Sequence, residues 1–475
     1  MSVVDRLAAG DLGFIEPGRL AGFIRERRWF GAKSSEVVGA HVMACVPLTE
    51  TPPLAAALVE MRLEVGTHHV YQVLVGLHPA GEEPPGPVIS EVDGWVVYEA
   101  IDDPDAVVAM LRMMRSQGAV QHGEARVEFQ PLPGLPQEIP PPRSLTTVAG
   151  GDQSNSLVVL DGELVLKAYR RLEAGPNPEV EMLAFLESHG FHNIPSLAGW
   201  YAYSGLPLDA TLGLAYHFIS NASGGWGLAL SDLEQDGDFF AHQAERLGEV
   251  TGRMHCVLAS DDEDPAFAPE QTSAETLTLL GATLDEQVGP LFESIASRPE
   301  LAEAVAPIAH RAEEIRERLR TLSKLEGIGR KVRAHGDYHL GQVLWNGEDW
   351  VILDFEGEPA RPLPERRRKR SPLRDAAGML RSFSYAAAVA DRRGLPHAEA
   401  WEDRTRAAFR EGYLHAVGPA GLLPSGRTTT DKLIAFFELE KALYEVRYEL
   451  GHRPEWVGVA VRAMERLLDR SPEAP

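Results

Sequence analysis

The sequence is poor in cysteine and has no long hydrophobic run. Its 475 residues include only two cysteines, Cys45 and Cys256, which are far apart in the chain. A disulfide framework is therefore not expected, and the chain suits a reducing compartment. No uninterrupted apolar stretch reaches about 18 residues, and the N-terminus lacks a basic segment followed by an apolar one. We therefore expect neither a membrane span nor a secretory leader, and we place the protein in the cytoplasm.

Positive charge is also scarce. Lysine and arginine total 46 against 70 aspartate and glutamate residues, which gives a formal net charge of −24. A surface this acidic repels phosphate backbones, so neither nucleic acid nor an anionic membrane is an expected partner. The chain also lacks the G-x-x-x-x-G-K-[ST] pattern, which excludes a P-loop nucleotide site.

The sequence does contain three regions of different character, and its length suggests about three domains. Short alternating apolar runs before residue 105 predict a small strand-rich unit, preceded by a helix over about Pro17–Arg27. A further helix is expected over 105–118. A proline-rich connector then ends near Arg143, and strands flanking one helix are expected over 144–220. From about residue 230 onward the chain reads as mostly helical, except at 331–356. We therefore expect domains at 1–105, 106–220 and 221–475.

The exceptional segment reads KVRAHGDYHLGQVLWNGEDWVILDFEGEP, residues 331–359. Asn346-Gly347 between two apolar runs is a strong hairpin signal. With a loop over Asn346–Asp349, Trp345 pairs with Trp350, and Gln342 falls opposite Leu353 beside Asp354. Gln342 and Asp354 both offer hard oxygen ligands, which suit magnesium.

Asp337 precedes Gln342 by five residues, on the same predicted loop. A carboxylate there can orient a substrate hydroxyl and accept its proton during phosphoryl transfer. The alternative for the acids in this segment is a surface hairpin with solvated side chains. An ordered set of base, amide ligand and acid ligand around one hairpin favours the catalytic interpretation.

His335 and His339 flank Asp337 and raise a competing hypothesis. H-x-D-x-H spacing also occurs in metal-dependent hydrolases, where the histidines bind zinc or iron. That hypothesis leaves Gln342 and the segment after Leu353 unexplained. We therefore expect both histidines to fix the loop through hydrogen bonds with the backbone.

Residues suited to a nucleotide precede this segment. A hairpin is expected from LVVL (157–160) through Asp161-Gly162 to LVLKAY (164–169), and its second strand carries Lys167. The next predicted helix begins with Glu179 and Glu181. A Lys–Glu pair that aims the amine at phosphates is the expected companion, and we prefer Glu181 as the partner of Lys167.

The loop AGGDQSNS (149–156) precedes the hairpin and is small, polar and glycine-bearing. Its backbone N–H groups and the hydroxyl of Ser154 or Ser156 could cover phosphates. Such segments are also common as plain turns, so the loop alone is a weak signal.

Taken together, these segments resemble the maltokinase family, within the wider aminoglycoside-phosphotransferase-like kinases. The resemblance is carried by HGDYHLGQVLWNGEDWVILDFEGEP, by DQSNSLVVLDGELVLKAYRRLEAGPNPEVE (152–181) and by FELEKALYEVRYELGHRPEW (437–456). RRWFGAKS (27–34) is similar to the start of the family's cap domain. The resemblance implies an α+β, bilobal, protein-kinase-like fold with an N-terminal strand-rich cap and a mostly helical C-lobe.

The resemblance also implies ATP-dependent phosphorylation of maltose to maltose 1-phosphate, which feeds α-glucan and glycogen synthesis from trehalose. By the same resemblance, Asp337 is the base, Gln342 and Asp354 bind Mg²⁺, and Lys167 contacts ATP. A sugar is the expected partner, and association with a trehalose synthase is a further expectation.

Lys441, Tyr444 and Tyr448 share one face of a predicted helix, at positions i, i+3 and i+7. A cation and two aromatic rings suit a disaccharide, and the resemblance places this face in the sugar site. The alternative is packed core.

Two other functions stay open. The acceptor could be glucosamine or an aminoglycoside, because relatives with the same kinase core include glucosamine kinases. The chain could instead be a non-catalytic nucleotide-binding partner of a trehalose-processing enzyme. Asp337, Gln342, Asp354 and Lys167 are all present, which argues against that last hypothesis.

Overall fold

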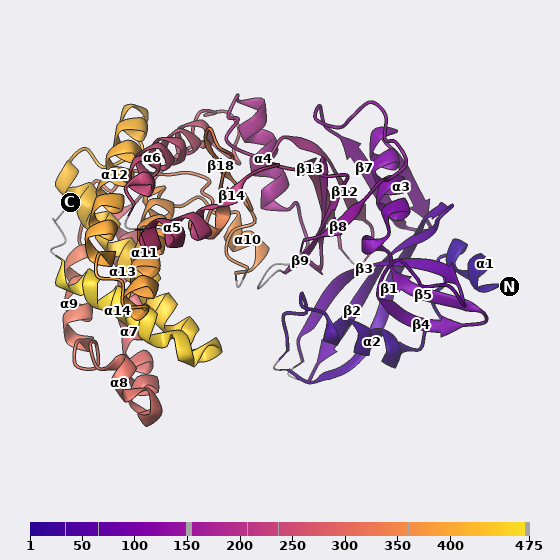
Figure 1. Cartoon of the computed structure of the whole chain (residues 1–475), viewed down its shortest axis with the longest axis horizontal. Helices are drawn as coiled ribbons and strands as arrows, with labels where there is room; N and C mark the ends of the chain where they lie inside the picture. Colours follow the sequence, from indigo (N-terminus) through magenta and orange to yellow (C-terminus); the bar gives the residue numbers. More distant parts are fainter. Residues whose placement is uncertain are drawn as a thin grey trace. The chain divides into compact units, whose positions relative to one another are not determined.

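The computed structural model describes residues 1–33, 35–64, 66–148, 154–206, 208–235, 237–359 and 361–470. The chain divides into two compact units (Figure 1). The first comprises Met1–Glu187, Pro195–Ser220 and Pro359–Leu363; the second comprises Ser188–Ile194, Asn221–Glu358 and Pro364–Pro475. The three-part division at residues 105 and 220 stays a prediction.

The first unit opens with an antiparallel sheet and two helices. The strands run in the order β1-β2-β3-β5-β4, with β11 added at β3. Their bounds are β1 Val37–Glu50, β2 Pro53–Leu63, β3 His68–Pro79, β4 Val88–Val92, β5 Trp95–Glu99 and β11 Arg171–Leu172; the helices are α1 Val3–Ala8 and α2 Pro17–Glu26. The expected strand-rich unit is thus present, and the predicted helix ends one residue earlier than expected.

Helix α2 covers one face of this sheet, and Figure 1 shows it along the indigo strands. Its buried residues Leu20, Phe23 and Ile24 follow helical spacing and join the same core cluster as Ala57 and Val59 of β2. The N-terminal core therefore forms between an amphipathic helix and a sheet, as the alternating sequence pattern predicts.

A second sheet in the same unit carries the predicted nucleotide residues. Its order is β6-β7-β12-β13-β10-β9-β8. The bounds are β6 Ala119–His122, β7 Ala125–Pro131, β8 Leu145–Thr147, β9 Asn155–Leu160, β10 Leu164–Tyr169, β12 Leu197–Ser204 and β13 Ala210–His217; helices α3 Pro104–Arg115 and α4 Pro178–Ser188 accompany it. The predicted hairpin is confirmed as β9 and β10, and Asp161 and Gly162 in its turn both have positive φ, 54° and 69°.

Arg170 links the two sheets of this unit. Its side chain is 1% exposed, and its Nη1 lies 3.1 Å from Glu99 Oε1 at the end of β5. Its guanidinium also lies over the ring of Trp29, 5.0 Å from the centroid. Because an unpaired buried charge is costly, this pair holds the end of β10 against the N-terminal sheet.

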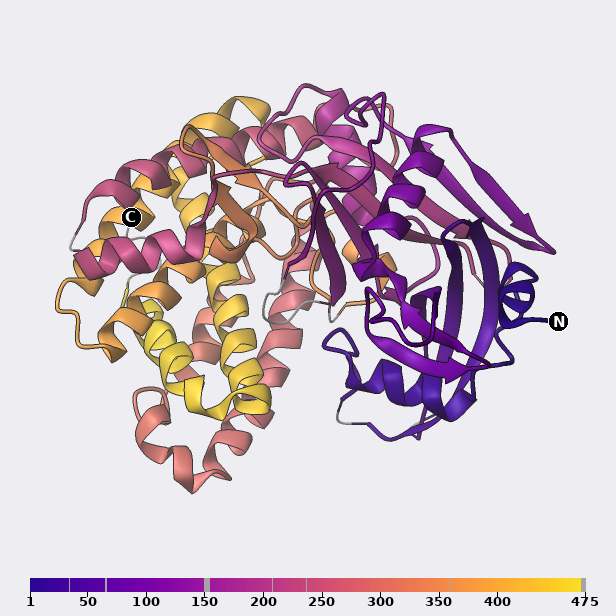
Figure 2. The ribbon, with the colours of Figure 1, turned by 45° about the vertical axis from the view of Figure 1, so that its right-hand side comes forward.

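The second unit is mostly helical, as expected (Figure 2). Its helices are α5 Gly225–Gln235, α6 Phe239–Leu258, α7 Ala274–Ala296, α8 Ala302–Val305, α9 Ala312–Leu322, α11 Leu373–Arg392, α12 Ala398–Val417, α13 Arg427–His452 and α14 Val457–Asp469; the short α10 spans Leu363–Arg366. Its strands are β14 Ser223–Gly224, β15 Glu270–Gln271, β16 Arg330–Lys331, β17 Val343–Trp345 and β18 Trp350–Ile352. None of the helices in the described ranges is both long enough and apolar enough to cross a membrane.

Two glycines allow α6 and α12 to pack closely. A Cβ at Gly248 would lie 2.1 Å from the carbonyl oxygen of Phe409, and one at Gly412 would lie 2.0 Å from that of Glu245. Any larger residue would force the helices apart. This contact fixes α6, which carries His255 beneath the predicted catalytic loop.

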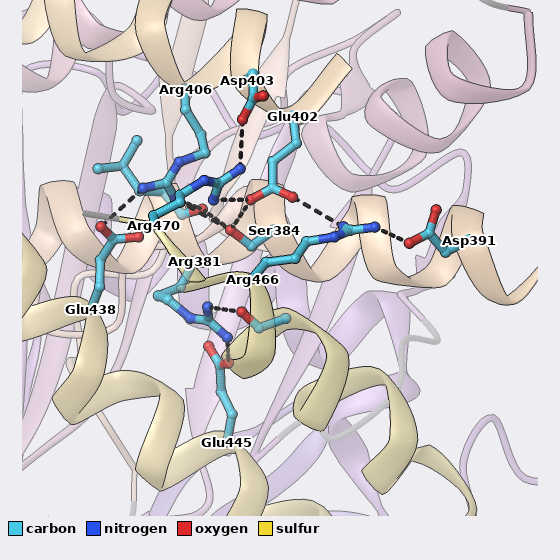
Figure 3. A network of polar contacts seen from close by, with 12 residues as sticks. Arg381, Ser384, Asp391, Glu402, Asp403, Arg406, Glu438, Glu445, Arg466 and Arg470 are labelled. Atoms are coloured by element: carbon cyan, nitrogen blue, oxygen red, sulfur yellow. Dashed lines mark hydrogen bonds and ion pairs between the residues drawn. The ribbon is translucent and has the colours of Figure 1, made fainter. Parts of the chain in front are cut away.

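A network of buried charges joins α11, α12, α13 and α14 (Figure 3). Glu402 is fully buried, and its two carboxylate oxygens lie 3.0 Å from Arg466 and 2.6 Å from Arg470. Beside it, Arg406 makes two bonds to Glu438, at 2.7 and 3.0 Å. Each of these buried carboxylates has a guanidinium partner, which is what burial of a charge requires.

Candidate active site

The hairpin of β17 and β18 has the predicted register. Trp345 pairs with Trp350, and the N–H of Leu353 donates to the carbonyl of Gln342 at 2.8 Å. The loop is fixed by Asn346, whose Oδ1 accepts from the backbone N–H of Glu348 and of Asp349 at 2.9 and 2.8 Å. The expected loop over Asn346–Asp349 is thus confirmed.

This register brings Gln342 and Asp354 together, as predicted. Gln342 Nε2 lies 3.1 Å from Asp354 Oδ2. Turning the amide by half a rotation places its oxygen beside the carboxylate, and the pair then presents hard oxygen ligands of the kind magnesium prefers. Asp354 has φ of 62°, a backbone conformation that non-glycine residues rarely adopt and that recurs at functional sites.

The loop that bears Asp337 is held from below by Asp375 of α11. Asp375 is 2% exposed, and it accepts from the backbone N–H of His335 at 2.7 Å and of Gly336 at 3.0 Å. His255 Nε2 lies 3.0 Å from the same carboxylate. Burial by itself would raise the pKa of Asp375, but the bond to His255, the charges of His255 and His335 and the bond from Gly336 together lower it, so the carboxylate stays charged.

His335 and His339 contact the backbone, as the sequence analysis expects. Nε2 of His335 lies 2.8 Å from the carbonyl oxygen of Leu353, and its Nδ1 accepts from the N–H of Asp337 at 3.4 Å. Nδ1 of His339 accepts from the N–H of Gly341 at 3.0 Å. His335 therefore ties the loop of Asp337 to the residue before Asp354, with both ring nitrogens engaged, which argues against a role as a metal ligand.

Asp337 lies beside a cation and keeps access to solvent. Its side chain is 22% exposed, and its Oδ1 lies 3.2 Å from Lys441 Nζ. Burial by itself would raise the pKa of Asp337, but the charge of Lys441, with smaller contributions from His339 and His335, lowers it overall. The carboxylate is therefore ionised near neutral pH and can accept a hydrogen bond from a hydroxyl group.

Lys441, Tyr444 and Tyr448 form a half-buried stripe on α13, not packed core. Lys441 Nζ lies 5.0 Å from the ring centroid of Tyr444, whose centroid lies 6.1 Å from that of Tyr448. The core-facing side of the helix is instead formed by other residues, including Leu443 and Val446. The stripe thus begins at Lys441, beside Asp337, and runs along the helix toward its C-terminus.

Arg381 fixes the rotation of α13 at this stripe (Figure 3). Its side chain is fully buried, and its Nη2 lies 2.7 Å from Glu445 Oε2. Glu445 follows Tyr444 directly, and its charge is one of those that raise the pKa of Lys441. The network of buried charges therefore reaches the stripe through one ion pair.

In the first unit, Lys167 pairs with Glu179. Nζ of Lys167 lies 2.7 Å from Glu179 Oε2, and both side chains are about 5% exposed or less. The hydroxyl of Tyr169 donates to the same carboxylate oxygen at 2.7 Å. Glu181, the partner preferred from the sequence, lies about 200° further around α4 than Glu179, and its role at the nucleotide stays a prediction.

The predicted phosphate loop lies largely outside the described residues, since these resume at Ser154. Ser154 is exposed, immediately before β9. Ser156 Oγ accepts from Arg170 Nε at 2.8 Å, so that hydroxyl is tied to the sheet. A role of Ser154 at the nucleotide stays a prediction.

The residues that support the loop of Asp337 were not identified from the sequence. Asp375 and His255 belong to none of the sequence motifs described above. The two lie 120 positions apart in the chain. The buried acid in an otherwise apolar helical pattern was the one available signal, because a buried charge requires partners.

Comparison with known proteins identifies both parts of the chain. A family model described as the phosphotransferase enzyme family matches residues 145–426, more than half of the chain. A second model, described as the maltokinase N-terminal cap domain, matches residues 23–103. The expected relationship to cap-bearing phosphotransferases is thus confirmed.

Similar proteins include two that are named glucosamine kinase. One, from Mycolicibacterium smegmatis, is 27% identical over 398 residues, covering 81% of this chain and 92% of its own length. The other, from Streptacidiphilus jiangxiensis, is 26% identical over 335 residues, covering 67% of this chain and 72% of its own length.

Solved structures of glucosamine kinases share the fold of this chain. Crystal form B of a glucosamine kinase has a TM-score of 0.70 at 19% identity, covering 99% of this chain and 100% of that chain. A glucosamine kinase in complex with glucosamine, ADP and inorganic phosphate has a TM-score of 0.67 at 19% identity, covering 94% and 98%. The expected α+β kinase-like fold is confirmed, and the chain belongs to the phosphotransferase enzyme family.

Proposed function

We propose that this phosphotransferase is an ATP-dependent sugar kinase whose acceptor is maltose, phosphorylated at its anomeric hydroxyl. The observation that supports it most is Asp337, partly exposed and 3.2 Å from Lys441 at the start of an aromatic stripe. A hydroxyl bound there meets an ionised carboxylate, and the rest of a sugar can lie along Tyr444 and Tyr448. Aromatic side chains combine apolar surface with a polar tip, a combination that suits sugar rings.

Each proposed residue has one task. Asp337 orients the acceptor hydroxyl and takes its proton as the bond to phosphorus forms. Lys167, held by Glu179 at 2.7 Å, contacts the nucleotide phosphates, with Ser154 as a further contact. Gln342 and Asp354 would hold magnesium, which when bound neutralises charge on the phosphates.

Glucosamine is the second candidate acceptor, because the similar proteins above are named glucosamine kinases. An amino sugar carries an ammonium group at neutral pH, and Lys441 already occupies the position of a cation beside Asp337. Maltose carries no charge and needs no carboxylate partner there. The match of residues 23–103 to a cap domain named for maltokinase also favours maltose.

The setting of the reaction follows from the same proposal. ATP as phosphoryl donor suits the cytoplasm, and maltose 1-phosphate as product suits α-glucan synthesis. Association with a trehalose synthase would supply the acceptor.

The test is ADP release with ATP and magnesium against maltose, glucose, glucosamine and kanamycin, with phosphorus NMR to locate the new ester. We expect turnover with maltose and a phosphate on its anomeric carbon. Turnover with glucosamine but not maltose would transfer the proposal to an aminosugar kinase. No turnover with any acceptor would favour a non-catalytic nucleotide-binding module.

A further inference from the structure

The aromatic stripe on α13 continues past Tyr448. His452 lies on the next turn, is exposed, and places its ring 4.4 Å from that of Tyr448, with an angle of 18° between the ring planes. From Lys441 to His452 the helix rises by about 16 Å, or three turns. A pyranose ring is about as long as one turn, so a disaccharide that starts at Asp337 covers only part of the stripe.

Polar groups accompany this last turn. Arg453 is 46% exposed, and its guanidinium carbon lies 5.4 Å from the ring centroid of Tyr448. The same guanidinium is held by Glu449, whose two oxygens lie 2.7 and 3.0 Å from its nitrogens. Tyr385 fixes Glu449 from α11, with a bond of 3.0 Å from its hydroxyl. Arg453 is thus a preorganised donor that is still accessible to solvent.

Tyr385, which bonds to Glu449 of this turn, belongs to a group of three aromatic side chains. Trp226, Tyr385 and Trp456 are half-buried and pack around a cluster of small residues on α11 and α14. The rings of Trp226 and Tyr385 lie 6.0 Å apart. Partly exposed aromatic rings next to fixed charged donors are a composition that suits sugars, since rings cover apolar faces and charged groups bond to hydroxyls.

We propose that the acceptor site extends over the last turn of α13, where His452 and Arg453 form a further sugar-binding position, so that the enzyme phosphorylates linear α-linked glucose oligosaccharides longer than a disaccharide. This inference rests on the proposed function. The reducing end stays at Asp337, and each added glucose unit lies one turn further from it.

The chemistry at the reactive end is unchanged. The bond between the γ-phosphorus and the oxygen of ADP breaks, a bond from the anomeric oxygen to that phosphorus forms, and the proton of the hydroxyl passes to Asp337. The new position contributes binding of the third unit and leaves the reacting atoms alone. Its effect should therefore be seen in kcat/KM for longer acceptors.

The test compares kcat/KM for maltose, maltotriose and maltotetraose in the wild-type enzyme and in His452→Ala. His415→Ala is the matched control, because it removes another exposed histidine from the last turn of a helix. We expect wild type to use maltotriose at least as well as maltose. His452→Ala should lower the value for maltotriose by about fivefold and leave maltose within about twofold.

A ring-retaining variant separates contact with the sugar from a fold defect. His452→Phe should stay within about twofold of wild type on maltotriose, because it keeps the aromatic face. If the wild-type enzyme phosphorylates maltose but not maltotriose, this inference alone is overturned. The same holds if His452→Ala lowers kcat/KM equally for both sugars. Failure on every glucose oligosaccharide would overturn the proposed function as well.

Discussion

Lys441 Nζ lies 3.2 Å from Asp337 Oδ1, although 104 positions separate the two residues in the chain. The contact joins the loop before β17 to helix α13. It determines both the charge of the proposed base and the direction in which a sugar can lie, since the aromatic stripe starts at this lysine.

Removing the ammonium group should move the acid limb of the pH–rate profile. In wild type, burial raises the pKa of Asp337, but Lys441, with smaller contributions from His339 and His335, lowers it below its ordinary value, so the carboxylate stays ionised throughout pH 5–8. In Lys441→Met burial dominates and the pKa rises, so kcat at saturating sugar should fall as the pH decreases from about 7 to 5. The exposed Lys324→Met is the control, and an unchanged acid limb would disprove this role of Lys441.

The contributions of Glu179 and Glu181 to the position of Lys167 can be compared with two matched variants. Glu179→Gln removes the charge that holds Lys167 at 2.7 Å, so KM for ATP should rise by about tenfold. Glu181→Gln removes a charge from the same helix and should leave KM for ATP within about twofold. The reverse order of the two effects would favour Glu181 as the partner.

The buried charge network predicts a large difference between two adjacent acids on α12 (Figure 3). Glu402→Ala leaves Arg466 and Arg470 without their buried partner, and breaking such pairs costs about 3–5 kcal/mol. Asp403 is 62% exposed, and its pair with Arg470 is worth about 0–1 kcal/mol. Thermal unfolding should show Tm lowered by about 10 °C in Glu402→Ala and nearly unchanged in Asp403→Ala. Equal shifts would mean that the network does not stabilise the fold.

Local sequence rules were sufficient to predict the hairpin of β17 and β18. Asn346-Gly347 determines a turn, the turn determines the register, and the register places Gln342 beside Asp354. The same reasoning found the hairpin of β9 and β10. Each of these predictions depends on residues within about 20 positions of one another, where chain geometry leaves few alternatives.

Two kinds of contact could not be predicted from the sequence. One depends on which face a helix turns to its neighbour, and the other joins residues that lie far apart in the chain. The choice between Glu179 and Glu181 depends on which face α4 turns to β10, and that helix is apolar on more than one side. The bonds from Asp375 to His335 and to His255 link segments 40 and 120 positions apart, and no spacing rule connects them. Such contacts arise from packing of whole elements, as between α6 and α12.

Single-turnover transfer from ATP to maltose by Asp337→Asn tests the central claim most directly. The amide keeps the shape of the side chain but cannot take the proton, so the rate should fall by about 100-fold or more. Affinity for ATP, measured by calorimetry, should change by less than about threefold. A transfer rate within about threefold of wild type would contradict the assignment of Asp337 as the proton acceptor.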